Sequence, residues 1–327
     1  MNKLVSVETA AAMIRAGAPL AIAGPQAALD QLPAGTWIAG TIPYFMTPDG
    51  GVVVRDDRVF VTDLPEGASV KVAAYREKEL AAIVSNAPDN GFSLTIIPAG
   101  CEAHRTFAHD AAGYDGAFVR PTVGWIAGVP LEEIGRTTPK VYLGTGPHRY
   151  EDRAVVAHVA LPADRMVDVE IVNIFEPESG DVLEFDETAF SVETCLVNGK
   201  RARFADYVRE RGLDHGRLPL VGDFAGARIN VSLQKVDEQR GRVDLYAPVF
   251  PGVRYHFARP VADYAKAFRQ RLDGVDANGI VMGCNCVLNF VYGELEGKAI
   301  GGIAGPVTFG EIAYQLLNQT MATIRVV

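Results

Sequence analysis

The spacing of apolar residues divides the chain into many short strands and a few short helices. Tyr264, Phe268 and Leu272 recur every four residues, which predicts an amphipathic helix over 261–272. Weaker helical patterns occur at 6–16, 25–32, 76–86 and 202–211. Most other apolar runs are short and bounded by glycine, proline or aspartate, as strands are. Because hairpins replace strand–helix alternation beyond residue 140, the pattern predicts an α+β fold with mixed, largely antiparallel sheets flanked by short helices.

The C-terminal stretch, residues 278–327, combines apolar runs with polar side chains. Its first run, 279–290, is bounded by glycine and predicts a buried strand. A glycine-rich segment at 300–306, Glu311 and the polar trio 318–320 precede a last strand. Buried polar groups need partners, which can be protein, water or a ligand.

Two motifs in this stretch carry a family resemblance. Phe-Gly-Glu-Ile at 309–312 and Asn-Gln-Thr at 318–320 resemble the C-terminal half of the FIST domain, a family of sensory modules. The segments 38–42 and 197–208 resemble earlier FIST motifs less closely. The family places an arginine shortly after the strand cysteine, and this chain has none there. The resemblance implies a FIST-N-like domain over 1–197 and a FIST-C-like domain over 198–327, with a relation between the two left open.

The resemblance also implies a function. It predicts a sensory module that binds a small metabolite and signals through a separate partner protein in trans. An amino-acid-like compound is one candidate for this metabolite. The candidate ligand-binding residues combine family-matched positions with the polar clusters described next. They are Thr41, Tyr44, His104, Arg105, Cys284, Cys286, Glu311, Asn318 and Gln319.

The densest ionisable cluster lies between residues 101 and 110. Cys101, Glu102, His104 and Arg105 follow a predicted strand, and we expect them in a loop. Arg105 could pair with a ligand carboxylate through two hydrogen bonds. The alternative function is an enzyme that uses this cluster or Cys286, although no base for Cys286 is evident nearby in the sequence.

Cys284 and Cys286 alternate along the predicted strand, so their thiols share one face. The pair lacks a second Cys or His pair at metal spacing, and packing is the favoured interpretation. A lesser alternative is haem or metal binding through His104, His148 or the two thiols. We therefore expect neither a cofactor nor a metal.

The composition of the chain limits which classes of partner and which cell compartment are expected. A net charge of −9 without any basic cluster argues against nucleic acid. No apolar run approaches the roughly 18 residues of a membrane span. The N-terminus does not resemble a secretion signal, and four cysteines in 327 residues do not make a disulfide framework. These features predict a cytoplasmic protein with reduced thiols.

Overall fold

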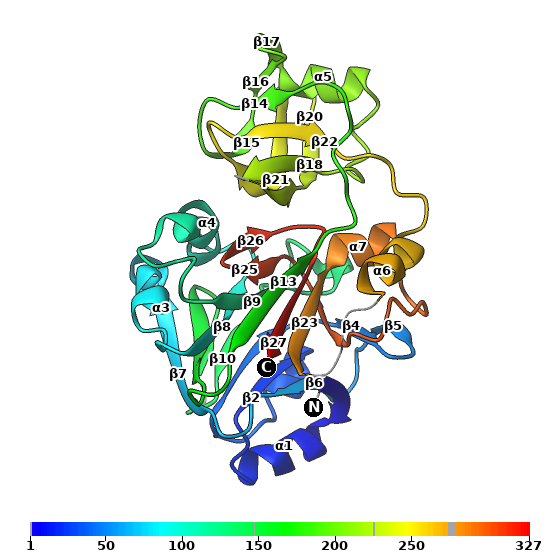
Figure 1. Ribbon diagram of the computed structural model, residues 1–327. Coiled ribbons are helices and arrows are strands. Elements are labelled where there is room, and N and C mark those ends of the chain that lie inside the picture. The colour runs from blue at the N-terminus through cyan, green and yellow to red at the C-terminus, as the bar shows by residue number, and fades with distance from the viewer. Residues whose placement is uncertain (1, 147, 225, 274–278) are drawn as a thin grey trace.

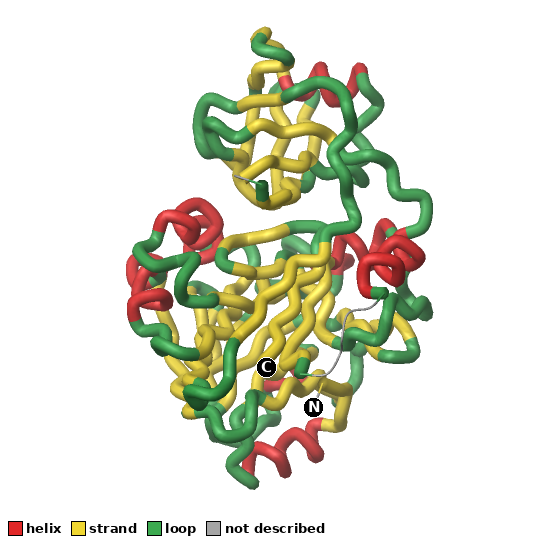
Figure 2. Tube along the Cα trace, viewed as in Figure 1, coloured by secondary structure: helices red, strands yellow, loops and turns green. Residues whose placement is uncertain are grey.

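The chain forms a large domain with a small domain inserted in it (Figure 1). A computed structural model describes residues 2–146, 148–224, 226–273 and 279–327. The predicted α+β class is confirmed, since mixed and antiparallel sheets carry short helices at their edges and faces (Figure 2). Residue 278, where the predicted C-terminal stretch begins, lies outside the described residues.

Three six-stranded sheets form the large domain within the described residues. In order, the first sheet contains β1 (Asn2–Ser6), β6 (Arg58–Asp63), β2 (Leu20–Gly24), β3 (Trp37–Thr41), β10 (Val141–Leu143) and β11 (His148–Tyr150). The second contains β26 (Gln315–Leu317), β25 (Glu311–Ala313), β9 (Thr122–Ala127), β8 (Gly91–Pro98), β12 (Arg153–Ala160) and β7 (Ser69–Arg76). The third contains β13 (Val167–Val172), β27 (Met321–Val326), β23 (Ile280–Cys286), β24 (Gly305–Thr308), β4 (Tyr44–Thr47) and β5 (Gly50–Val53).

One large apolar core lies between these sheets. It includes Ile38 from the first sheet, Ile96 from the second and Ile324 from the third, all fully buried. Phe45 of β4 stacks on Phe60 of β6 with ring centroids 5.6 Å apart. The pairs β2–β3, β8–β9 and β23–β24 are parallel, and the other pairs are antiparallel. Because the three sheets share one core, the N-terminal and C-terminal halves of the sequence do not form separate domains.

The helices are short and cover sheet faces or edges. α3 and α4 pack on the second sheet through Ile83 and Phe107, in a cluster with Ile97 and Ile126. The described helices are α1 (Val7–Arg15), α2 (Gln26–Leu29), α3 (Ala81–Ser85), α4 (Glu102–Asp110), α5 (Phe204–Glu210), α6 (Tyr264–Leu272) and α7 (Val287–Tyr292). None of the described helices is long and apolar enough to cross a membrane.

The small domain has a core of its own. Its strands are β14 (Leu183–Glu184), β15 (Ala189–Val192), β16 (Thr194–Val197), β17 (Lys200–Arg203), β18 (Leu220–Phe224), β19 (Ala227–Val231), β20 (Leu233–Asp237), β21 (Arg242–Val249) and β22 (Arg254–Phe257). With α5 they enclose a cluster in which Phe185 meets Phe204 and Tyr255 edge to face. A separate buried core is the physical mark of a domain.

The predicted boundary between residues 197 and 198 is wrong. It falls in the tight turn between β16 and β17, where Asn198 has a φ of 51°. The third sheet also joins β4 and β5 to β23, β24 and β27, so strands from both predicted halves share one sheet. The small domain is instead an insertion between β13 and α6 (Figure 1).

Two segments differ from the predicted elements. The run 279–290 is a strand only as far as Cys286, and α7 follows it directly. The first four residues of α7 are all buried: Val287, Leu288, Asn289 and Phe290. The helix therefore lacks the alternation of polar and apolar faces by which a helix is recognised in a sequence. The predicted loop after β8 is α4, which presents Ala103, Phe107 and Ala108 to the sheet at helical spacing.

Candidate functional site

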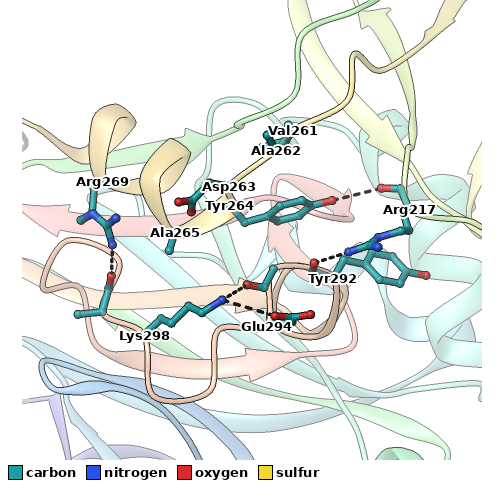
Figure 3. Close-up of a pocket in the computed structure, with 12 residues that line it drawn as sticks. Arg217, Val261, Ala262, Asp263, Tyr264, Ala265, Arg269, Tyr292, Glu294 and Lys298 are labelled. Atoms are coloured by element: carbon teal, nitrogen blue, oxygen red, sulfur yellow. Dashed lines mark hydrogen bonds and ion pairs between the residues drawn. The ribbon is translucent and has the colours of Figure 1, made fainter.

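A cleft of about 690 Å³ lies where the small domain meets α6 and α7 (Figure 3). Arg217, from the segment between α5 and β18, lines the small-domain side. Residues 261–265 and Arg269 of α6 line a second side, and residues 292–294, 298 and 299 line the third. Its volume falls in the range of small-molecule pockets.

Local sequence explains how α6 and α7 form two walls of the cleft. Asp263 caps α6 by accepting a hydrogen bond from the Lys266 N–H at 2.8 Å. Tyr264 and Phe268 then face the core. Gly293 caps the C-terminal end of α7, and a Cβ atom there would lie 2.6 Å from the Tyr264 Cβ. Only glycine allows the two helices to approach this closely.

The charges of the cleft are incompletely compensated. The Arg217 Nη2 donates to the Tyr292 carbonyl at 2.8 Å, and the Arg269 Nη1 donates to the Ala299 carbonyl at 2.9 Å. Both of these contacts are to backbone carbonyls, and neither guanidinium forms an ion pair with a carboxylate within the described residues. Lys298 lies 3.7 Å from Glu294 and donates to the Gly293 carbonyl. Two cationic groups therefore remain available to an anion.

Two tyrosines complete the walls. The Tyr264 hydroxyl donates to the Arg217 carbonyl at 3.3 Å, and the Arg217 guanidinium lies 5.8 Å from the centre of the Tyr292 ring. Burial raises the pKa of Tyr264 to about 12 and also raises the pKa of Tyr292. Both hydroxyls therefore stay protonated near neutral pH. The Tyr264 proton is used in the bond to the Arg217 carbonyl, and the Tyr292 hydroxyl can donate to a ligand.

Glu311, a predicted ligand-binding residue, is fully buried beside Cys286 in the large domain. Its Oε2 accepts hydrogen bonds from the Thr320 N–H at 3.2 Å and the Thr320 hydroxyl at 2.6 Å. Its Oε1 has no partner in the described part of the chain. Burial raises the pKa of Glu311 to about 8, against the lowering effects of Thr320 and the Cys286 thiol.

The thiols of Cys284 and Cys286 are buried on β23. Cys284 donates to the Gly124 carbonyl at 3.3 Å. Burial raises the pKa of both thiols, and the nearby Glu311 charge raises them further. A protonated, enclosed thiol is a poor nucleophile.

Gln319 and Asn318 lie between Glu311 and the small domain. The Ser232 hydroxyl donates to the Gln319 Oε1 at 2.7 Å, and the Gln319 Nε2 donates to the Arg217 carbonyl at 3.2 Å. Asn230 donates to the Gln319 carbonyl at 3.2 Å. The Asn318 amide donates to the Leu317 carbonyl. Gln319 was predicted to contact a ligand directly. In the structure it instead forms hydrogen bonds to the small domain, including the backbone carbonyl of Arg217.

His104 and Arg105 lie on α4, and their contacts are local. The His104 Nδ1 accepts a hydrogen bond from the Gly100 N–H at 3.1 Å, and Arg105 pairs with Glu102 one turn earlier. The His104 side chain is half-buried, yet its Nε2 is enclosed without a partner among the described residues. Burial, followed by the Arg105 charge, lowers the pKa of His104 to about 4. The structure does not bring this cluster into the cleft.

Thr41 and Tyr44 lie at another edge of the large domain. Thr41 ends β3 and lines a second cavity of about 240 Å³. The Tyr44 hydroxyl accepts a hydrogen bond from the Leu131 N–H at 2.9 Å, and burial raises its pKa. The nine predicted residues are therefore spread over three places, with Glu311, Cys284, Cys286, Asn318 and Gln319 forming the one connected group.

The residues that line the cleft were not predicted from the sequence. Arg217, Arg269 and the pair Tyr292 and Lys298 come from three separate segments, and no motif joins them. The nearest signal is Asp263, whose position before an amphipathic run marks the start of a helix. In the described ranges, no three His, Cys, Asp or Glu side chains are grouped as metal ligands.

Comparison with known proteins corrects the family. The model of a family of unknown function, DUF6976, matches residues 5–327. The match covers nearly the whole chain, so the FIST assignment is wrong, and its short C-terminal motifs do not indicate common family membership. No curated protein matches the sequence. The chain belongs to the DUF6976 family.

Proposed function

We propose that this protein binds a small organic anion, a carboxylate metabolite such as an amino acid, in the cleft between its two domains. The observation that carries the proposal is that Arg217 and Arg269 line a 690 Å³ cleft without carboxylate partners in the described residues. The chain as a whole carries a net charge of −9, whereas this cleft is lined by more cationic than anionic side chains.

The chemistry of the walls suits a carboxylate. Guanidinium groups bind carboxylates through charge-assisted, often bidentate hydrogen bonds. The neutral hydroxyl of Tyr292 adds a further donor, whereas the Tyr264 hydroxyl is already donated to the Arg217 carbonyl. Asp263 and Glu294 also line the cleft, and either carboxylate can receive the ammonium group of an amino acid. Val261, Ala262 and Ala265 offer apolar contact to a side chain.

The position of the cleft supports a sensing role. Arg217 belongs to the inserted domain, whereas Arg269 and Tyr292 belong to the large domain, so a ligand that contacts them all stabilises one relative placement of the domains. We infer that the ligand favours a more closed form and that a separate partner protein recognises this form. Small-angle X-ray scattering should then show a smaller radius of gyration in the ligand-bound protein.

The enzyme alternative has less support. The Cys286 thiol is buried and its pKa is raised, and Arg105 is paired with Glu102 on a helix outside the cleft. A ligand that is recovered chemically unchanged after incubation favours binding, whereas its conversion would favour catalysis.

The proposal is tested by ligand screening with a variant of Arg217. Ligands that bind the folded state raise its melting temperature by mass action. We expect small carboxylates and amino acids to raise it, and matched amides without a carboxylate to have little effect. Calorimetric titration of Arg217→Ala with the best carboxylate should show an affinity at least about tenfold lower, since a charged hydrogen bond contributes roughly 1.5–3 kcal/mol.

Arg211→Ala is the matched control. Arg211 is an exposed arginine at the end of α5, 3.6 Å from Asp181 and outside the cleft. Its removal should leave the affinity unchanged. If carboxylates and amides shift the melting temperature equally, or if Arg217→Ala binds as tightly as the unaltered protein, the proposal is wrong.

A further inference from the structure

The second cavity, of about 240 Å³, lies at the carboxyl ends of strands from two sheets. Thr41 ends β3, which runs parallel to β2, and Gly128 follows β9, which runs parallel to β8. The Gly128 N–H donates to the Thr41 carbonyl at 2.8 Å and joins the two edges. The carboxyl ends of parallel strands are where open sheets bind ligands.

The walls of this cavity are mostly apolar. Ile42, Val54 and Val129 contribute aliphatic surface. Pro25, Pro43 and Pro130 add flat ring surface and have no N–H to offer. Such walls favour the apolar body of a ligand and give few donors to an anion.

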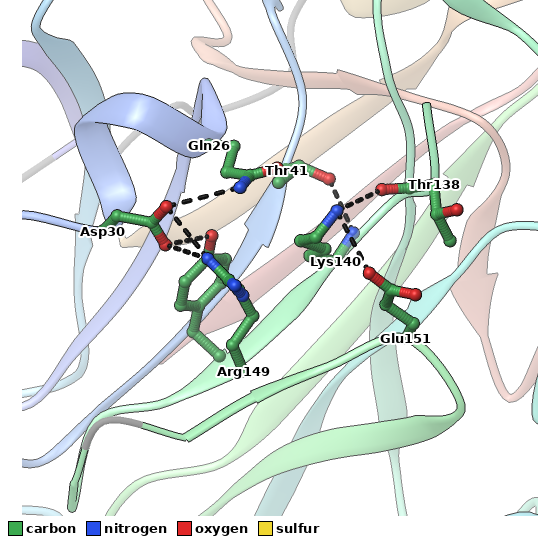
Figure 4. Close-up of polar contacts among 8 residues, drawn as sticks. Gln26, Asp30, Thr41, Thr138, Lys140, Arg149 and Glu151 are labelled. Carbon is green, nitrogen blue, oxygen red and sulfur yellow. Dashed lines mark hydrogen bonds and ion pairs between the residues drawn. The ribbon is translucent and has the colours of Figure 1, made fainter. Parts of the chain in front are cut away.

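The cations around the cavity are already paired (Figure 4). Arg149 donates to both oxygens of Asp30 at 3.0 Å, and Lys140 lies 3.1 Å from Glu151 and donates to the Thr138 carbonyl. At the mouth, Arg55 lies 2.5 Å from Glu132. Arg149, Lys140 and Arg55 are thus each held by a carboxylate, and Arg136, which follows in the same turn as Glu132, donates to the Glu132 carbonyl.

One carboxylate at this cavity is not paired. Glu133 lines it directly, and its side chain has no hydrogen-bond or ion-pair partner within the described ranges. Glu132, next to it in a 3₁₀ turn (Leu131–Glu133), is occupied by Arg55. The cavity therefore has an apolar interior, one carboxylate without a hydrogen bond or ion pair among the described residues at its edge, and the hydroxyls of Thr137 and Thr138.

We propose that this cavity is a second binding site, which takes a small alkylammonium compound whose ammonium group pairs with Glu133. The apolar chain of the ligand lies against the proline and aliphatic walls. The site is separate from the interdomain cleft and has the opposite charge preference.

The test compares three molecules of one shape by calorimetric titration and saturation-transfer NMR: butylammonium, butanol and butyrate. Butylammonium should bind at least tenfold more tightly than butanol, and butyrate should bind least. Glu133→Gln should reduce the affinity for butylammonium at least tenfold. Arg55→Ala should increase it severalfold, because the negative charge of Glu132 is then no longer neutralised.

Arg217→Ala supplies the control that separates the two sites. It should leave butylammonium binding unchanged while it weakens carboxylate binding in the interdomain cleft. Glu133→Gln should weaken butylammonium binding and leave carboxylate binding unchanged. Equal affinities for butylammonium and butanol would overturn the proposal, and so would unchanged butylammonium binding in Glu133→Gln. Either result leaves the proposed function of the cleft intact.

Discussion

At the scale of single residues, Glu311 has the most unusual environment. A fully buried carboxyl group needs more partners than Thr320 and the Cys286 thiol supply, and the Oε1 atom has no hydrogen-bond partner among the described residues. Burial therefore holds this group in its neutral form, with a pKa of about 8. The sequence indicated that Glu311 is buried and needs hydrogen-bond partners. It did not indicate that the carboxyl group would be protonated instead of fully hydrogen-bonded.

The first prediction concerns the pH dependence of stability. The pKa of Glu311 is raised from 4.5 to about 8 in the folded protein, so folding takes up a proton between these values. Its stabilising effect is complete below pH 4.5 and is lost as the pH rises through 8. The shift corresponds to a free energy on the order of 5 kcal/mol. Glu311→Gln, which resembles the protonated form, should remove this dependence.

Denaturant unfolding at several pH values measures the effect. Glu311→Gln and the unaltered protein should have similar free energies of unfolding near pH 4.5, and the variant should be several kcal/mol more stable at pH 8.5. Parallel curves for the two proteins across this range would mean that Glu311 is not protonated in the fold.

At the scale of elements, the contact between α6 and α7 determines the shape of the cleft. The amphipathic pattern predicted α6 correctly, apart from its first turn, because three aromatic and aliphatic side chains repeat at helical spacing. The same reasoning missed α7, since its exposed residue, Val291, is apolar like its buried ones and the helix therefore shows no amphipathic pattern. α4 was missed because its polar residues dominated the interpretation, although Ala103 and Phe107 already showed a helical interval.

The second prediction tests the close approach of these helices. Gly293→Ala places a methyl group 2.6 Å from the Tyr264 Cβ and 2.7 Å from the Asn289 carbonyl oxygen. We expect a loss of about 1–3 kcal/mol in the free energy of unfolding, since overpacking of this kind forces the backbone to move. Anion binding in the cleft should weaken together with the stability.

Gly180→Ala is the control for that variant. Gly180 lies in a turn where an added Cβ meets nothing within 4 Å. Its substitution should change the free energy of unfolding by less than about 0.5 kcal/mol. If both variants lose the same stability, the close contact at Gly293 has no special role.

At the scale of the whole molecule, the small domain is held by a chain of polar contacts. Asn173 and Asn230 exchange amide hydrogen bonds of 2.9 and 3.1 Å, and Gln319 bonds to Ser232, Asn230 and the Arg217 carbonyl. The same segment continues through Thr320 to Glu311. Val221 and Ile229 of the small domain add apolar contact with the large core.

The third prediction concerns this contact. Ser232→Ala removes the donor to the Gln319 Oε1 and leaves a buried acceptor unpaired, which costs about 1–3 kcal/mol. Hydrogen exchange of the amides in β18 and β19 should become faster, and the affinity of the cleft should fall because Gln319 also holds Arg217. Ser191→Ala, at an exposed serine that donates to Asp244, should change neither. Unchanged exchange in Ser232→Ala would contradict this role of Gln319.

The organisation of the whole molecule was the least predictable from sequence. Local patterns identified strands, and the replacement of strand–helix alternation by hairpins beyond residue 140 predicted the α+β class correctly. They carry no information on which strands pair, so the pairing of β24 with β4, which are more than 250 residues apart, was not foreseen. The domain boundary and the cleft both depend on such distant pairings, and this is why the predicted residues clustered around Glu311 instead of Arg217.

The most direct test is a crystal structure of the protein with the carboxylate that binds best in the screen. The account predicts ligand density between Arg217 and Arg269, with the carboxylate within hydrogen-bonding distance of at least one guanidinium and of the Tyr292 hydroxyl. Density at another site, with an empty cleft between the domains, would contradict it.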